Sequence, residues 1–211
     1  MQQALKSKDN PAHRTVLGLS LIRSGEAGIG LAELEAAYKQ DSTQTQAGVS
    51  LVSVYLRTGR AAKAVAVAES LVKQQPGSPS FFNVLGMAKG QAGDLPGAKA
   101  AFEQAVKLND KFVAPKINLA RLEIAAKAYD AATVRLAAIL KVNEKNTEAM
   151  GEMAVLSERR GQQAEAQRWL EKATDLAGPK DVRWGLALSE FHMRHDRPGR
   201  QQHQRRRQRP A

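Results

Sequence analysis

Small and apolar residues return along the chain at a fixed spacing of 34 residues. One phase carries small residues in every copy: Gly30, Ala64, Ala98, Ala132 and Ala166. A second phase carries large apolar residues: Leu17, Leu51, Leu85, Leu119 and Met153. A third carries glycine in four copies and lysine in the remaining one: Gly25, Gly59, Gly93, Lys127 and Gly161. A period of this length is typical of stacked helical repeats, which bind other chains far more often than they catalyse reactions.

The stretch 79–112 shows how one copy is built. Apolar and small residues recur with helical spacing over two segments, about 79–91 and 96–108, with a turn at Gly93 between them. Glycine suits the left-handed residue that follows a helix. Pro96 suits the first turn of the second helix, where its missing N–H costs little. Each copy is therefore predicted to be a helical hairpin.

The two helices of this hairpin are predicted to pack closely. Gly86 and Ala98 are small, so the helix axes can approach each other, and Phe102 fills the space beside them. The residues that repeat along the chain are accordingly interpreted as core residues, which carry no information about a partner.

This pattern resembles the tetratricopeptide repeat, whose signature has a large residue, Leu-Gly and Tyr in its first helix, then Ala, Phe and Ala in its second, and a final Pro. In one unit those places hold Phe82, Leu85-Gly86, Lys89, Ala98, Phe102, Ala105 and Asp110. The chain departs from the signature because most units lack the final Pro and Lys127 replaces a turn glycine. The resemblance implies an all-α, right-handed superhelical solenoid of helix-turn-helix repeats.

The register predicts five complete repeats with a partial element at each end. The repeats are predicted at 11–44, 45–78, 79–112, 113–146 and 147–180. Residues 1–10 resemble the second half of a preceding second helix, residues 181–196 the first helix of an incomplete sixth repeat, and residues 197–211 a basic, disordered tail.

Both ends suggest a fragment of a longer array. The tail from Arg197 has no apolar residue larger than Ala, so it cannot supply the helix that should complete the sixth repeat. Its richness in Arg, Pro, Gln and His is typical of GC-rich DNA translated out of frame. We therefore hypothesise a shifted reading frame after Arg197.

Composition and charge exclude some kinds of site and segment but leave the predicted fold unchanged. The chain has no Cys, which excludes disulfides and, within this sequence, a lipid-attachment cysteine. It has no apolar run of the roughly 18 residues that span a bilayer and no signal-peptide pattern at its start. The net charge is +11, of which +6 lies in residues 194–211.

No catalytic or cofactor-binding constellation is recognisable, so we expect no enzyme activity, no cofactor and no small-molecule substrate. Gly28-Ile29-Gly30 falls inside a predicted helix rather than in a phosphate-binding loop. His192 and His195 have a spacing that could share a metal, but further ligands of a known motif are missing, so we predict no metal site. The Arg205–Arg209 run could attract nucleic acid or an anionic surface, yet no aromatic residue is interleaved for stacking.

A protein or peptide partner is the remaining expectation. In tetratricopeptide arrays the first helix of each repeat lines a concave groove, and the resemblance maps partner-binding positions onto ten residues: Arg23, Ser53, Arg57, Asn83, Met87, Gln91, Asn118, Arg121, Glu158 and Arg159. Ile124 and Val155 belong to the apolar part of the same predicted surface. The carboxylate-clamp set of Lys and Asn that some of these proteins use is not reproduced here.

A narrower resemblance rests on the run from Phe112 to Glu123, on Ala131-Ala132 and on the run from Lys145 to Met150. These stretches look like tetratricopeptide lipoproteins of the exosortase (PEP-CTERM) system, which accompany exopolysaccharide production and protein sorting in bacterial envelopes. The resemblance implies a scaffold in the periplasm or cell envelope, with the signal upstream. Two alternatives stay open: a cytoplasmic adaptor of unrelated role, and a binder of nucleic acid or anionic surfaces through the Arg-rich tail.

Overall fold

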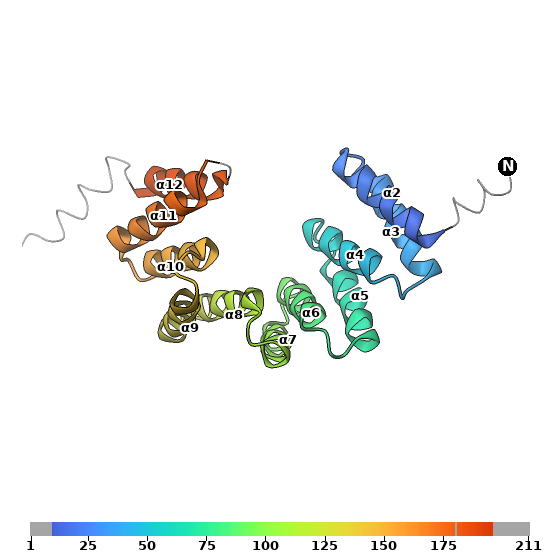
Figure 1. Cartoon of the computed structure of the whole chain (residues 1–211), viewed down its shortest axis with the longest axis horizontal. Coiled ribbons are helices and arrows are strands. Elements are labelled where there is room, and N and C mark those ends of the chain that lie inside the picture. Colours follow the sequence, from blue (N-terminus) through green and yellow to red (C-terminus); the bar gives the residue numbers. More distant parts are fainter. Residues whose placement is uncertain (1–9, 180, 196–211) are drawn as a thin grey trace, which may run out of the picture. The chain divides into compact units, whose positions relative to one another are not determined.

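The computed structural model describes residues 10–179 and 181–195. These residues form eleven helices and no strand. The helices are α2 (Pro11–Arg23), α3 (Ala27–Gln40), α4 (Thr45–Arg57), α5 (Ala61–Gln74), α6 (Pro79–Gln91), α7 (Leu95–Leu108), α8 (Val113–Ala125), α9 (Tyr129–Val142), α10 (Thr147–Arg159), α11 (Gln163–Ala177) and α12 (Val182–His195) (Figure 1). The predicted all-α solenoid of helical hairpins is confirmed.

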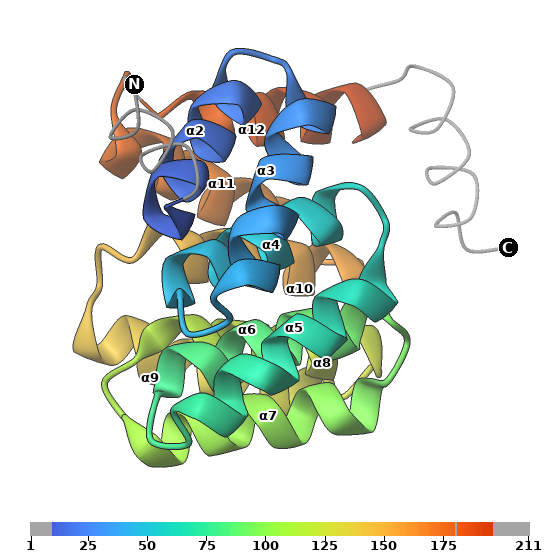
Figure 2. The ribbon, with the colours of Figure 1, turned by 90° about the vertical axis from the view of Figure 1, so that its right-hand side faces the viewer.

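The chain divides into two compact units, one up to Pro115 and the other from Lys116. In the first unit each helix packs on the next in sequence order from α2 to α7, and these helices can be followed from blue to green in Figures 1 and 2. In the second unit α9, α10, α11 and α12 pack in the same consecutive way. None of the described helices is both long and apolar enough to cross a bilayer.

The predicted repeat boundaries remain a prediction, although one hairpin lies within each of the five ranges. The second helix of the third hairpin begins one residue earlier than predicted, at Leu95, because Asp94 caps it. The Asp94 carboxylate accepts a hydrogen bond of 2.9 Å from the Gly97 amide. Apart from Asn10, the features predicted for residues 1–10 and 197–211 lie outside the described residues, as does the frameshift hypothesis.

The first unit has a continuous core drawn from consecutive hairpins. Leu34, Leu51 and Leu71 are almost completely buried at its centre. The recurring small residues are buried in all five described hairpins, as their spacing predicts: Gly30, Ala64, Ala98, Ala132 and Ala166. The prediction that Leu17 belongs to the core is wrong, because its side chain is 49% exposed. Its counterparts Leu51 and Leu85 belong to helices that pack on a preceding helix, and within the described residues α2 has no helix before it.

The recurring set Gly25, Gly59, Gly93, Lys127 and Gly161, which we call the turn phase, follows the first helix of each hairpin, and its backbone conformation explains why glycine recurs there. Gly25, Gly59, Gly93 and Gly161 have φ values between 70° and 96°, a range that residues with a Cβ rarely adopt. Lys127 occupies the same place in its hairpin with φ of 61° and is the one described non-glycine residue with a positive φ. Lys127 therefore adopts a left-handed backbone conformation, which is unfavourable for a non-glycine residue by about 1–2 kcal/mol of free energy.

Contact inside the third hairpin also depends on a missing side chain. A Cβ placed on Gly86 would lie 2.5 Å from ring carbons of Phe102, closer than any ordinary contact. Gly86 is therefore the opening into which Phe102 packs, as the sequence predicts. Gly90, one turn later on α6, has only the Ala98 Cβ nearby, at an ordinary 3.7 Å.

Neighbouring hairpins are also joined by equivalent polar contacts. The Tyr55 hydroxyl on α4 donates a hydrogen bond of 2.6 Å to the Glu35 carboxylate on α3. Lys89, at the place in α6 that Tyr55 has in α4, lies 3.5 Å from the Glu69 carboxylate on α5. The hydrogen bond from Tyr55 lowers the pKa of Glu35 against the opposing effect of burial, and burial together with Glu35 raises the pKa of Tyr55.

We predict that Lys127→Gly stabilises the protein by about 0.5–1 kcal/mol, because relief of the left-handed conformation outweighs the extra chain entropy of glycine. The matched exchange Gly93→Lys should destabilise by a similar amount. Urea unfolding of both variants beside the parent chain measures the difference. A Lys127→Gly variant that is clearly less stable would contradict the assignment of strain to this turn.

We predict opposite effects for two alanine substitutions one turn apart on α6. Gly86→Ala should destabilise by about 1–3 kcal/mol, because the new methyl group overlaps the Phe102 ring. Gly90→Ala should stabilise by about 0.5–1 kcal/mol, because alanine favours the helix and meets only ordinary contact. Thermal unfolding of the two variants makes the comparison, and equal effects would show that the hairpin has room at Gly86.

Candidate partner-binding surfaces

The residues predicted to line a groove in the first unit differ in their exposure. Arg23 and Arg57 are exposed at the ends of α2 and α4, and Ser53 is exposed one turn before Arg57. Met87 is 44% exposed on α6 and adds an apolar side chain. Together they offer a mixed apolar and cationic surface on the first helices of the hairpins.

Two other predicted residues of the first unit are occupied by contacts within the protein. Asn83 is 9% exposed, and its side-chain nitrogen lies 3.8 Å from the Met87 sulfur. The Gln91 amide donates a hydrogen bond of 2.7 Å to the Leu56 carbonyl, which ties the end of α6 to α4. Asn83 and Gln91 therefore contribute to packing within the protein rather than to the exposed surface.

Arg121 bridges two first helices in the second unit. From α8 its guanidinium donates to Glu152 at 2.7 Å and to Glu148 at 3.1 Å, both on α10, and to the Asn118 side-chain oxygen at 3.0 Å. Burial opposes the positive charge, but Glu152 and Glu148 outweigh that effect and raise the pKa of Arg121. Arg121 thus holds α8 and α10 together while one side of it remains exposed.

Glu158, another predicted groove residue, contacts the last described helix. Its carboxylate accepts two hydrogen bonds from the Arg194 guanidinium at 3.2 and 3.1 Å, and it lies 2.8 Å from the His195 ring nitrogen. Burial acts to raise the pKa of Glu158, but the bonds from His195 and Arg194 prevail and lower it. The carboxylate therefore joins α10 to α12.

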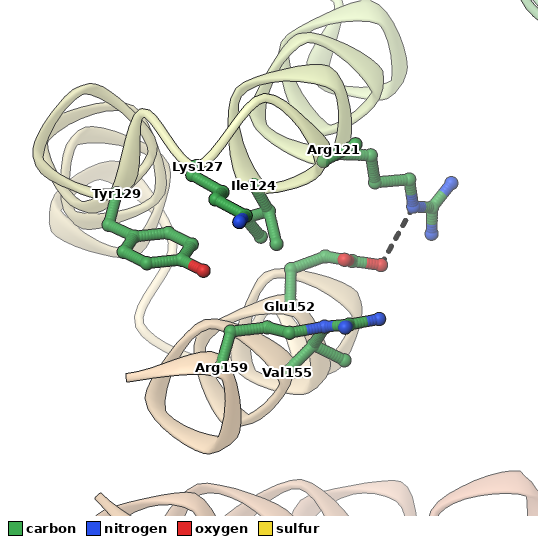
Figure 3. A pocket seen from close by; sticks show the side chains of 8 residues that line it. Arg121, Ile124, Lys127, Tyr129, Glu152, Val155 and Arg159 are labelled. Atoms are coloured by element: carbon green, nitrogen blue, oxygen red, sulfur yellow. Dashed lines mark hydrogen bonds and ion pairs between the residues drawn. The ribbon is translucent and has the colours of Figure 1, made fainter. Parts of the chain in front are cut away.

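A pocket of about 420 Å³ lies between α8, the α8–α9 turn and α10 (Figure 3). Its volume is within the range of about 300–1,000 Å³ found for ligand sites. Lys127 and Tyr129 extend into it from the turn and the start of α9, opposite Val155 and Arg159 on α10 (Figure 3). The remaining lining residues are Arg121, Ile124, Ala125 and Glu152.

The sequence located part of this pocket and missed the rest. Arg121 and Arg159 are among the ten predicted residues, and Ile124 and Val155 belong to the same predicted surface. Lys127 and Tyr129 were missed because the prediction considered only the first helix of each repeat. The break in the glycine phase at Lys127 was the signal that could have drawn attention to this turn.

Within residues 10–179 and 181–195 no group of three or more His, Asp or Glu side chains is placed to hold a metal ion. His192 and His195 lie in the last turn of α12, and His195 is bonded to Glu158. Asp196, the acidic residue that follows them in the sequence, lies outside the described residues.

Stacked hairpins with glycine turns and small-residue contacts define a helical repeat protein. Sequence models described as tetratricopeptide repeat match residues 15–79, 91–149 and 148–172. The chain therefore belongs to the tetratricopeptide repeat proteins. This fold is generally that of a non-catalytic scaffold for protein–protein interactions.

Solved structures of the same fold are similar over most of the chain. A tetratricopeptide repeat protein of Thermus thermophilus, TTC0263, has a TM-score of 0.72 and 21% identity over 87% of this chain and 99% of its own. PilW, a type IV pilus biogenesis factor, has a TM-score of 0.68 and 17% identity over 88% and 87%. YrrB, described as having an unusual peptide-binding site, has a TM-score of 0.57 and 18% identity over 90% and 97%. No curated protein sequence matches the chain.

We predict that Glu158→Gln lowers the unfolding temperature at neutral pH and that this loss shrinks in acid. Because the folded protein lowers the pKa of Glu158, its stabilising effect is full above the ordinary value of 4.5. The effect disappears as the pH falls below that value, since the carboxylate is then protonated. Thermal unfolding between about pH 7 and pH 3 measures the difference.

Glu190→Gln is the matched control, because Glu190 is an exposed carboxylate on α12, the helix that carries Arg194 and His195. It should change the unfolding temperature little at any pH. If the unfolding temperature of Glu158→Gln stays below that of the parent chain by the same amount through the acid range, the carboxylate contributes no ionic contact between α10 and α12.

Proposed function

We propose that the protein is a non-catalytic scaffold that holds an extended segment of a protein partner on the first helices of its hairpins. The ten residues that the sequence predicted are proposed as contacts or as supports of such a surface in each unit. Arg23, Ser53, Arg57, Asn83, Met87 and Gln91 belong to the first unit, and Asn118, Arg121, Glu158 and Arg159 to the second. The pocket between α8 and α10 is the best-defined part of these surfaces. This pocket is the observation that carries the proposal, because it combines apolar and charged side chains in a preformed hollow.

The chemistry of the surface favours a peptide over a small polar molecule. Val155 is 41% exposed at the pocket and Met87 is similarly exposed in the first unit, so apolar side chains of a partner would gain burial there. The polar neighbours can hydrogen-bond to an extended backbone. Because the helices already hold these groups in place, little ordering cost falls on the protein when it binds.

The description of YrrB as carrying a peptide-binding site supports this class of partner for the fold. For the setting, we propose envelope or exopolysaccharide assembly of the exosortase (PEP-CTERM) type. That part rests on the sequence runs at Phe112–Glu123 and Lys145–Met150 alone. Exosortase and glycosyltransferase genes beside the coding gene would support it, and their absence would favour an adaptor of another role.

A displayed library of random dodecapeptides, selected on the immobilised protein, tests the binding function. We predict that selected peptides lose about tenfold in affinity to Val155→Asn, since an apolar contact worth about 1.4 kcal/mol is removed. Fluorescence anisotropy of the labelled peptides provides the affinities.

Val134→Asn is the matched control, because Val134 is a 71% exposed valine on α9 that does not line the pocket. Its affinity for the same peptides should equal that of the parent chain. If selection yields no binding peptide, or if both variants bind like the parent, the pocket is not a partner-binding surface.

A further inference from the structure

Lys127 is the exception in the turn phase, and its backbone is strained for that reason. The four equivalent turns carry glycine with φ between 70° and 96°, so glycine would adopt the conformation of Lys127 without steric strain. Strain of this kind is found where a side chain has a use that compensates for it. The position of the Lys127 side chain indicates what that use is.

The Lys127 side chain lines the pocket opposite Arg159 (Figure 3). Within the described part of the chain neither cation forms an ion pair. Glu152, the acidic residue of the lining, is bonded at 2.7 Å to Arg121. Arg121 also pairs with Glu148, but with Lys127 and Arg159 added the positive charges around the pocket still outnumber the negative ones.

Apolar and aromatic groups accompany the two cations. Val155 is exposed on α10 between Glu152 and Arg159, and Ile124 contributes a further apolar wall from α8. The Tyr129 ring lies beside Lys127 at the start of α9 (Figure 3). A ligand that satisfies all of these groups needs an anionic group next to an apolar one.

We propose that Lys127 and Arg159 bind an Asp or Glu side chain of the partner segment, while a neighbouring apolar side chain of that segment packs on Val155. The inference rests on the proposed function and names the partner class for the same site. Ammonium and guanidinium groups form charge-assisted hydrogen bonds with carboxylates, which are stronger than neutral ones. The two cations come from different hairpins, so an acidic side chain between them would also link α10 to the α8–α9 turn.

The dodecapeptide selection gives the first test. Peptides selected on the parent chain should be enriched in Asp and Glu beside an apolar residue, and their affinity should fall as salt is raised. Lys127→Gly and Arg159→Gln should each reduce the affinity about tenfold or more. Lys127→Gly is the decisive variant, because it should fold more stably than the parent chain while it binds less well.

Lys141→Gln is the control, because Lys141 is an exposed cation of α9 outside the pocket. It should leave the affinity unchanged. If peptides bind but lack acidic residues, or bind Lys127→Gly as tightly as the parent chain, the inference is wrong and the scaffold function stands. If no peptide binds at all, the proposed function fails with it.

Discussion

The structure depends on close approach between paired helices, as the first and third hairpins show. At Gly86 the Phe102 ring occupies the space of the missing side chain, and in the first hairpin Gly18 and Gly30 bring their backbones into contact. A hairpin built in this way has a second face that stays apolar, so it must pack on its neighbour to be stable. Consecutive packing within each unit follows from that requirement.

Polar contacts between hairpins vary while their positions stay the same. Tyr55 and Lys89 occupy equivalent places on α4 and α6, and each contacts a glutamate of the preceding helix. A hydroxyl that donates a hydrogen bond and an ammonium group that forms an ion pair can replace each other here, because both are attracted to a carboxylate at the same register. Lys89, a departure from the family signature, therefore preserves the contact between hairpins.

Under our proposal, the charged residues of the second unit that bind a partner differ from those that stabilise the fold. Arg121 and Glu158 are committed to contacts between helices, with Glu152 and with Arg194 respectively. Lys127 and Arg159 line the pocket without such partners in the described residues. Under our proposal the strain at Lys127 is the cost of presenting a cation at a turn, where a glycine would serve the fold better.

The fold could be predicted from the amino acids alone, because a 34-residue period places small, large and glycine residues at fixed points of every hairpin. The contact of Gly86 with Phe102 and the left-handed turns were predictable for the same local reason. The sequence did not predict which surface residues stay exposed for a partner, because this depends on contacts with side chains that are distant in sequence. Glu158 meets Arg194 and His195 across 36 and 37 residues, and Asn83 is covered inside its unit. Lys127, Tyr129 and Arg159 meet at one pocket through packing, because a turn and two helices from successive hairpins must come together before the hollow exists.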